Sequence, residues 1–309
     1  MSTVATGESF LHPALFYRDE QEYTAGTVPF VQEGLAAGEA VAVAVPGPNL
    51  ELIKSALGSS ADEVQFLDMT EVGRNPGRII PGVLRAFADA HGEGRVRIIG
   101  EPIWAGRTAM EYPACVQHEA LINAAFQGRD ATILCPYDTV RLDAEVIADA
   151  WATHPTVIDQ GRELSSEAYD WHTVVARYNE PLAYPVGAAA LAFGAEELPA
   201  ARYFAVKQAE VLGLARDREE DLALLVAELT TNSVVHGGGS GTLRMWAEGE
   251  RIVCEVRDGG RLADPLAGRR PPARGQLGGR GLLLVNYLAD LVRVHTAEDG
   301  TTVRFYLNR

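Results

Sequence analysis

Two polar residues, Glu228 and Asn232, stand four positions apart in the segment 221–239, which reads DLALLVAELTTNSVVHGGG. On a helix, residues at this spacing share one face. The opposite side of such a helix is apolar and carries Leu222, Leu225, Val226 and Leu229. An amide oxygen can ligate a hard cation such as Mg²⁺, and a carboxylate can orient or deprotonate a hydroxyl nucleophile. The same pair also fits a plain amphipathic helix, so its meaning depends on the motifs around it.

Two glycine-containing motifs follow, each at the boundary of an expected element. Asp258 and Gly260 come directly after an expected strand, where a buried carboxylate can accept a hydrogen bond from adenine N6. Gly279-Arg280-Gly281-Leu282 opens an apolar helix expected over 282–291, and amides at a helix N-terminus attract anions. Each motif alone is a weak signal. In this order and at these boundaries, the three motifs together are a strong signal.

The expected elements of the second half place these motifs in an α/β sandwich over residues 187–309. Asp217 and Glu220 form a reciprocal capping pattern that predicts the start of the helix carrying the polar pair. His236 lies four residues beyond Asn232 on the same face, and Gly237 follows it. The remaining elements are a helix over 198–212 and two hairpins over 242–257 and 292–307.

Residues 1–158 alternate between strand-like and helix-like segments, which predicts βαβ units and a mostly parallel sheet. The expected strands are 40–45, 64–67, 96–99 and 131–135, and the expected helices are 20–37, 50–57, 77–91, 113–127 and 143–153. The segment 46–57 follows a strand but has two prolines and lacks the glycines of a phosphate loop, so we expect no phosphate site there. Residues 159–186 break the pattern and are interpreted as a connector with a short helix near Trp171–Tyr178.

Composition restricts the class of protein. A chain of 309 residues allows two domains of ordinary size. No apolar run approaches the ~20 residues that span a bilayer, and the first residues do not resemble a secretion signal. The three cysteines lie far apart without metal-binding spacing, which indicates reduced core thiols. We therefore expect a cytoplasmic protein without membrane segments.

The charge distribution argues against nucleic acid as a direct partner. The net charge is −15, and residues 187–309 carry 16 acidic and 15 basic residues. This leaves 26 acidic and 12 basic residues for residues 1–186, a net charge of −14. Such a front half repels phosphate backbones, and the back half shows no single-signed face.

The front half resembles the MEDS family of sensory domains, which are related to RecA-like ATPases that have lost the phosphate loop. The residues that carry the resemblance are His12, Phe16-Tyr17, 29–35 (PFVQEGL), 38–40 (GEA), 99–104 (IGEPIW), 119–123 (EALIN) and 135–138 (CPYD). The resemblance implies that this domain senses a ligand or signal, with His12 and Tyr17 as sensor residues. A structural histidine near a strand start is the other interpretation of His12.

Residues 187–309 resemble the GHKL ATPase superfamily, and within it the RsbW-like anti-sigma-factor serine kinases. The N box matches as 228–237 (ELTTNSVVHG), the G1 box as Asp258 and Gly260, and the G2 box as Gly279-Arg280-Gly281-Leu282. By resemblance, Asn232 holds Mg²⁺, Glu228 is the general base for a serine hydroxyl, and Asp258 reads adenine. His236 belongs to the same nucleotide-binding box, and the glycine boxes line the phosphates.

One position departs from the family pattern, and one segment is expected to close over the nucleotide. The G1 box often continues to a later glycine, but Leu262 stands there. Residues 261–278 are rich in Gly, Pro and Ala and are interpreted as a lid that orders on ATP binding. The arginines expected to meet the γ-phosphate are Arg269, Arg270, Arg274 and Arg280, although solvated loop charges would look the same.

These resemblances imply an ATP-dependent serine protein kinase that regulates transcription by partner switching. Its partners would be a small antagonist protein carrying the serine, a sigma factor, or both. A two-component histidine kinase is the first alternative, because His118 begins a superficially similar motif and His172 lies in the connector. A module that sequesters a partner without phosphorylating it is the second. The sequence leaves open whether the chain forms a homodimer.

Overall fold

The computed structural model describes residues 10–92, 94–271 and 279–309. Contacts between residues divide the chain into two compact units, which are treated separately. The first unit contains the residues up to Arg74 together with Ile79–Tyr178. The second unit contains Asn75–Arg78 and Asn179–Arg309.

An eight-stranded sheet forms the centre of the first unit. Its strands are β1 (Phe10–Leu11), β2 (Pro13–Tyr17), β3 (Ala40–Val45), β4 (Gln65–Asp68), β5 (Val96–Gly100), β6 (Ala131–Asp138), β7 (Thr156–Asp159) and β8 (Arg162–Ser165). The order is β4-β3-β5-β6-β2-β7-β8, with β1 beside β6. All pairs are parallel except β7 with β8. Strands such as β3 (AVAVAV) are apolar throughout because both faces of this sheet are covered.

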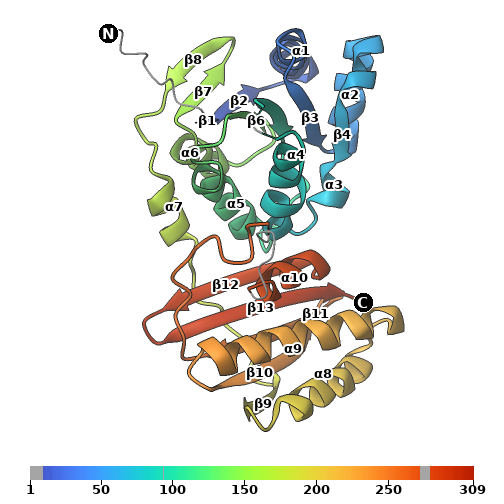
Figure 1. Ribbon diagram of the computed structural model, residues 1–309, viewed down its shortest axis with the longest axis vertical. Helices are drawn as coiled ribbons and strands as arrows, with labels where there is room; N and C mark the ends of the chain where they lie inside the picture. Colours follow the sequence, from blue (N-terminus) through green and yellow to red (C-terminus); the bar gives the residue numbers. More distant parts are fainter. Residues whose placement is uncertain (1–9, 93, 272–278) are drawn as a thin grey trace. The chain divides into compact units, whose positions relative to one another are not determined.

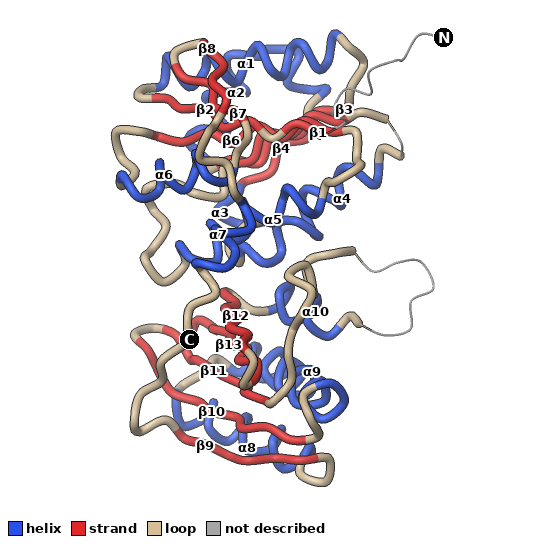
Figure 2. The backbone as a smooth tube through the Cα atoms, turned by 90° about the vertical axis from the view of Figure 1, so that its left-hand side faces the viewer, coloured by secondary structure: helices blue, strands red, loops and turns tan. Residues whose placement is uncertain are grey.

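Helices cover both faces of this sheet, as Figure 2 shows. They are α1 (Glu20–Ala36), α2 (Gly47–Leu57), α3 (Met69–Val72), α4 (Arg85–Ala90), α5 (Tyr112–Ala125), α6 (Ala144–Thr153) and α7 (Trp171–Arg177). On one face, Val31 of α1 and Ile53 of α2 pack with Val43 of β3 in one buried cluster. On the other, Val116 of α5 packs with Val174 of α7. Asp19 caps α1, where its side chain accepts a hydrogen bond from the backbone N–H of Glu22 at 2.8 Å.

Three parts of the first unit differ from expectation. The stretch before residue 18 contains β2, which lies buried between β6 and β7. The segment expected as a connector begins with the β7–β8 hairpin, whose turn residues Gln160 and Gly161 both have positive φ, as a tight hairpin turn requires. The helix expected over 77–91 is interrupted, because Pro81 cannot donate its backbone N–H and the chain forms a π-helical turn over Ile80–Leu84.

The second unit is a five-stranded antiparallel sheet with helices on one face (Figure 1). Its strands are β9 (Ala189–Gly194), β10 (Ser240–Glu248), β11 (Arg251–Asp258), β12 (Leu291–Ala297) and β13 (Gly300–Asn308), in the order β12-β13-β11-β10-β9. Its helices are α8 (Leu198–Leu212), α9 (Glu219–His236) and α10 (Gly281–Leu288). Apolar residues of all three helices and the inner sheet face form one core. The expected α/β class is confirmed in both units.

Two local expectations for this unit are not met. β9 was missed because its six residues, AALAFG, lack the alternation that marks a half-buried strand. The capping pair also does not form: Asp217 lies in a short 3-10 turn over Arg216–Arg218, and α9 begins after Arg218 without a side-chain cap. Glu219, Glu220 and Asp221 then fill the first turn of α9, where negative charge favours the helix dipole.

A buried ionic group lies on the other face of the five-stranded sheet. Arg304 donates to Glu255 Oε2 at 2.6 Å, and Arg244 donates to Glu255 Oε1 at 3.2 Å. The chain segment before β9 covers this group, since Arg304 also donates to the backbone oxygen of Ala183 at 2.8 Å. The guanidinium of Arg244 lies over the ring of Tyr184, with its Cζ atom 4.1 Å from the ring centroid.

Among the described residues, no helix is both long enough and apolar enough to cross a membrane.

Candidate nucleotide site

Helix α9 brings Glu228 and Asn232 to the same glycine. A Cβ placed on Gly281, the first residue of α10, would lie 2.7 Å from Glu228 Oε2 and 2.9 Å from Asn232 Nδ2. Both side chains are half-buried, because α10 packs along α9 at this point. The spacing of four residues therefore places both side chains on one face of α9, and this face meets the second glycine motif at Gly281.

Asp258 is held at the end of β11 by partners from α9 and its own loop. Ser233, next to Asn232 in the sequence, donates its hydroxyl hydrogen bond to Asp258 Oδ2 at 2.7 Å. The backbone N–H of Gly260 donates to Oδ1 at 2.8 Å. Gly237 must lack a side chain, since a Cβ there would lie 2.3 Å from the carboxyl carbon of Asp258. These contacts fix the carboxylate and leave each oxygen a lone pair for a further donor.

The loop after Asp258 is held by two threonines that sequence reasoning missed. The Thr301 hydroxyl donates to the backbone oxygen of Gly260 at 2.8 Å. The backbone N–H of Leu262 donates to the hydroxyl oxygens of Thr296 and Thr301 at 3.0 and 3.2 Å. Gln160 is the one described non-glycine residue with positive φ, so Leu262 occupies a backbone conformation that accepts a side chain. The backbone at Leu262 therefore does not need the positive φ that favours glycine.

A cavity of about 530 Å³ lies between α9, α10 and the loop after β11. Of the predicted site residues, it is lined by Asn232, His236, Asp258, Gly260, Gly279, Gly281 and Leu282. Glu228 and Arg280 are not lining residues, although Glu228 reaches the cavity edge at Gly281. Apolar side chains complete the wall, among them Leu229, Val256, Leu262, Leu266, Leu283 and Val303. The volume falls within the ~300–1,000 Å³ of small-molecule sites.

The arginines of the expected lid have different surroundings. Arg269 is buried, whereas Arg270 lines the cavity and forms an ion pair with Asp264. Arg280 is exposed and occupies the N-cap position of α10. Arg274 lies outside the described residues. Arg270 therefore lines the cavity together with Arg261 of the same segment, and Arg280 stands at the helix end where an anion would be favoured.

Gly281→Ala is expected to lower nucleotide affinity roughly 10-fold or more without unfolding the domain. The new Cβ would meet the ends of Glu228 and Asn232, which can swing away while the backbone stays in place. Alanine near a helix start normally stabilises by up to about 1 kcal/mol, so a lowered melting temperature is not expected. Titration with an ATP analogue and thermal unfolding measure the two effects.

Gly187→Ala is the matched control, because a Cβ there meets open space and the backbone is unstrained. Equal affinities for the two alanine variants would show that the contact at Gly281 has no role in the site.

The two predicted sensor residues of the first unit have different partners. Tyr17 donates its hydroxyl hydrogen bond to Glu101 Oε1 at 3.1 Å, and Tyr23 donates to Oε2 at 3.1 Å. Asn49 donates to both oxygens, at 3.0 and 2.8 Å. Glu101 follows β5 at the carboxyl edge of the parallel sheet, where ligands of such sheets bind. His12 is buried elsewhere, with its Nδ1 3.3 Å from Asn123 Oδ1.

Burial shifts the pKa values of these groups. Burial raises the pKa of Glu101 to about 7, although its hydrogen-bond donors favour the charged form. Burial also raises the pKa of Tyr17, with the charge of Glu101 adding to the shift. Burial and, to a smaller extent, the proximity of His154 lower the pKa of His12 to about 4. His12 is therefore neutral at pH 7, whereas Glu101 titrates near that pH.

The raised pKa of Glu101 predicts that the first unit loses stability as pH rises. Its stabilising contribution is fully present below the ordinary value of 4.5 and is lost as pH passes through about 7. The total change is roughly 3 kcal/mol in the free energy of unfolding. Denaturant unfolding between pH 4.5 and 8 measures how the free energy of unfolding depends on pH, and Glu101→Gln should lack the decrease that Glu101 causes. Glu163→Gln on exposed β8 should keep it; identical slopes for the two variants would contradict the assignment.

Comparison with protein families covers both units. Residues 11–155 match the MEDS family, described as the MEthanogen/methylotroph, DcmR Sensory domain. Residues 191–307 match the Histidine kinase-like ATPase domain. No curated protein matches the chain. The resemblances of the two halves to a MEDS domain and to a GHKL-type ATPase domain are thus confirmed, while the narrower resemblance to anti-sigma kinases stays a prediction.

Proposed function

We propose that the second unit binds Mg-ATP and transfers the γ-phosphoryl group to a serine of a partner protein, under control of the sensory unit. One observation carries the proposal: Glu228 and Asn232 both reach Gly281, at the edge of a cavity that also contains Asp258. The arrangement provides an acceptor for adenine, glycines for phosphates, an amide oxygen for a cation and a carboxylate for a hydroxyl. The match to a histidine kinase-like ATPase domain supports ATP as the ligand.

Each residue has a defined task in this scheme. Asp258 accepts the hydrogen bond of adenine N6, and the apolar cavity wall contacts the base. The backbone at Gly279 and Gly281 approaches the phosphates, and Gly279 has a φ of +78° that a side chain would strain. Asn232 would hold Mg²⁺, which neutralises phosphate charge when bound. Glu228 orients the attacking serine hydroxyl and takes its proton.

The surroundings of two histidines favour serine over histidine as the phosphorylated residue. His118 is only 1 % exposed on α5, so it is not accessible to a nucleotide-bearing domain. His172 is exposed on α7, but that helix has 7 residues. A histidine kinase needs a long helical hairpin just before its ATPase domain. In the described chain between α7 and β9 no further helix occurs.

The partners proposed for this kinase are a small antagonist protein that carries the serine and a sigma factor that the kinase sequesters. The acidic balance of residues 1–186 supports protein partners over direct binding of nucleic acid. Regulation of transcription would then pass through exchange of partners.

The test is incubation of the full chain with γ-labelled ATP, Mg²⁺ and candidate antagonist proteins. Acid-stable phosphoserine on the antagonist is expected, and label on the kinase itself is not. Acid-labile phosphohistidine on the chain would replace the proposal with a histidine kinase. Tight binding of the antagonist with ATP bound but no transfer would identify a sequestering module.

A further inference from the structure

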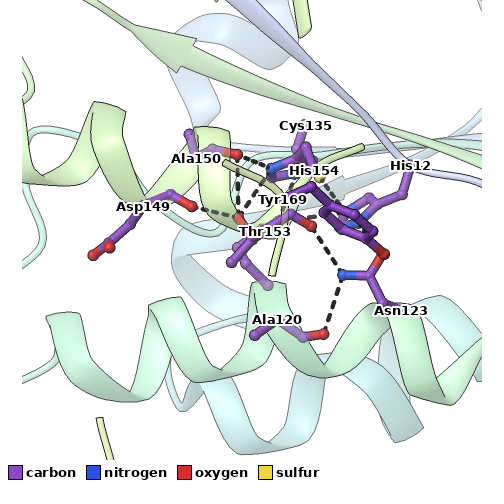
Figure 3. Close-up of polar contacts among 10 residues, drawn as sticks. His12, Ala120, Asn123, Cys135, Asp149, Ala150, Thr153, His154 and Tyr169 are labelled. Atoms are coloured by element: carbon purple, nitrogen blue, oxygen red, sulfur yellow. Dashed lines mark hydrogen bonds and ion pairs between the residues drawn. The ribbon is translucent and has the colours of Figure 1, made fainter. Parts of the chain in front are cut away.

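Four buried side chains meet inside the first unit, and none of them lines the nucleotide cavity. They are His12 between β1 and β2, Glu119 of α5, Cys135 of β6 and His154 after α6. One donor atom from each lies within 4.8 Å of the others, and none of the residues is more than 2 % exposed. Figure 3 shows His12, Cys135 and His154 gathered above α5.

Three distances within this cluster are close to the edge length of a small tetrahedron. His154 Nε2 and His12 Nε2 lie 3.2 and 3.5 Å from Glu119 Oε2. Cys135 Sγ lies 3.4 Å from His12 Nε2. Ligands about 2.0–2.3 Å from a tetrahedral ion are separated from each other by roughly 3.3–3.8 Å. Three of the donor separations therefore have the length that ligands of one ion require, and all four donors lie within 4.8 Å of one another.

Hydrogen bonds at the other ring nitrogens fix how the two histidines are turned. His12 Nδ1 faces Asn123 Oδ1 at 3.3 Å, and His154 Nδ1 faces the backbone oxygen of Ala150 at 2.8 Å. Asn123 is itself oriented, because its amide donates to the backbone oxygens of Ala120 and Thr153 (Figure 3). Both Nδ1 atoms therefore donate, and the Nε2 atom of each ring is directed at Glu119.

Without a cation, this cluster leaves buried polar atoms unsatisfied. Both carboxylate oxygens of Glu119 and the Nε2 atom of His154 lack a hydrogen-bond partner. Polar atoms of Glu119 and His154 thus remain unsatisfied in a dry interior, which costs several kcal/mol. A divalent ion removes the conflict. With a carboxylate, a thiolate and two neutral imidazoles, the total charge of the occupied site is zero.

We propose that His12, Glu119, Cys135 and His154 bind one Zn²⁺ ion in a closed tetrahedral site. Two nitrogens, one sulfur and one oxygen form a donor set that suits zinc, and four protein ligands leave no position for a substrate. Binding releases the thiol proton of Cys135 to solvent as the Zn–S bond forms. The ion joins the start of β2, α5, β6 and the end of α6, so its loss would loosen the domain assigned to sensing.

Metal content of the purified full chain tests the site directly. Protein expressed with added Zn²⁺ should carry close to one zinc per chain by mass spectrometry. Chain loaded with Co²⁺ instead should show the visible absorption of a tetrahedral ion and a thiolate-to-cobalt charge-transfer band. A folded wild-type chain with neither zinc nor this band would overturn the proposal. That result would mean that a proton shared between the histidines and Glu119 stabilises the cluster in place of a metal ion.

Matched variants separate binding at this cluster from binding elsewhere. Cys135→Ser should remove the charge-transfer band and weaken metal affinity by more than roughly 100-fold, while Asn123→Ala should weaken it roughly 10–100-fold. Cys115→Ser, which changes another buried thiol, should keep both metal and band. Equal loss in Cys115→Ser would reject the assigned ligands. Where Cys135→Ser does not fold, the Co²⁺ spectrum of the wild type decides alone.

Discussion

Asn232→Ala is expected to abolish Mg²⁺-dependent ATP binding, with a loss of affinity of at least roughly 100-fold, while the domain stays folded. The amide is half-buried against Gly281 and lines the cavity, whereas the neighbouring hydroxyl of Ser233 is already bonded to Asp258. Alanine favours the helix, so α9 keeps its core contacts. The expected effect is therefore on the cation and not on the fold.

Calorimetric titration of the variant with ATP, with Mg²⁺ and then with a chelator, measures this effect. The wild type should lose affinity for ATP when the chelator removes Mg²⁺. The variant should bind ATP in the presence of Mg²⁺ only as weakly as the wild type does after chelation. Asn308→Ala, at the exposed end of β13, is the control and should bind as the wild type does. Unaltered Mg²⁺ dependence in Asn232→Ala would remove the assignment of the metal ligand.

Glu228→Gln is expected to leave ATP binding intact and to slow phosphoryl transfer by roughly 10²–10⁴-fold. The glutamine has the same shape and can keep its place against Gly281, but it cannot accept the proton of a serine hydroxyl. Because Glu228 is not a lining residue of the cavity, the adenine ring and the phosphates of ATP lose no contact in this variant. This change therefore separates the chemical step from binding.

Single-turnover transfer from labelled ATP to the antagonist, measured beside ATP affinity, tests Glu228. Glu248→Gln, at the exposed end of β10, is a control for the loss of one negative charge. Normal transfer by Glu228→Gln would exclude the carboxylate as a base, and the proposed kinase would then need another group. A variant that lost ATP binding instead would assign Glu228 to the nucleotide and not to the hydroxyl.

The candidate site was predictable where its information is local. A spacing of four residues sets Glu228 and Asn232 on one face of α9, and glycines mark the ends of β11 and the start of α10. The lid arginines were predictable only as charges, since their surroundings depend on tertiary packing. Arg269 is buried and Arg270 pairs with Asp264, which no spacing rule indicates.

Features that depend on distant pairing could not be predicted from the sequence. Thr296 and Thr301 support the loop at Leu262 because β12 and β13 pair beside it, about 40 residues along the chain from Asp258. The four-residue cluster joins His12 to His154 across the whole first unit. β9 has no alternation of its own and forms because β10 offers an edge. In each case the position of a residue or strand depends on contacts with a segment that is distant in the sequence.

The ionic group of Glu255 restricts how this chain can change over generations. Glu255 is 1 % exposed and is shared by Arg244 and Arg304, so losing it would leave two cations with no counter-ion and cost roughly 3–5 kcal/mol. Replacing all three by well-packed apolar residues would be close to neutral. Replacing the three residues one at a time would therefore pass through a strongly destabilised chain before the apolar combination is reached. The three positions should therefore vary together across related sequences, and scarcely at all one by one.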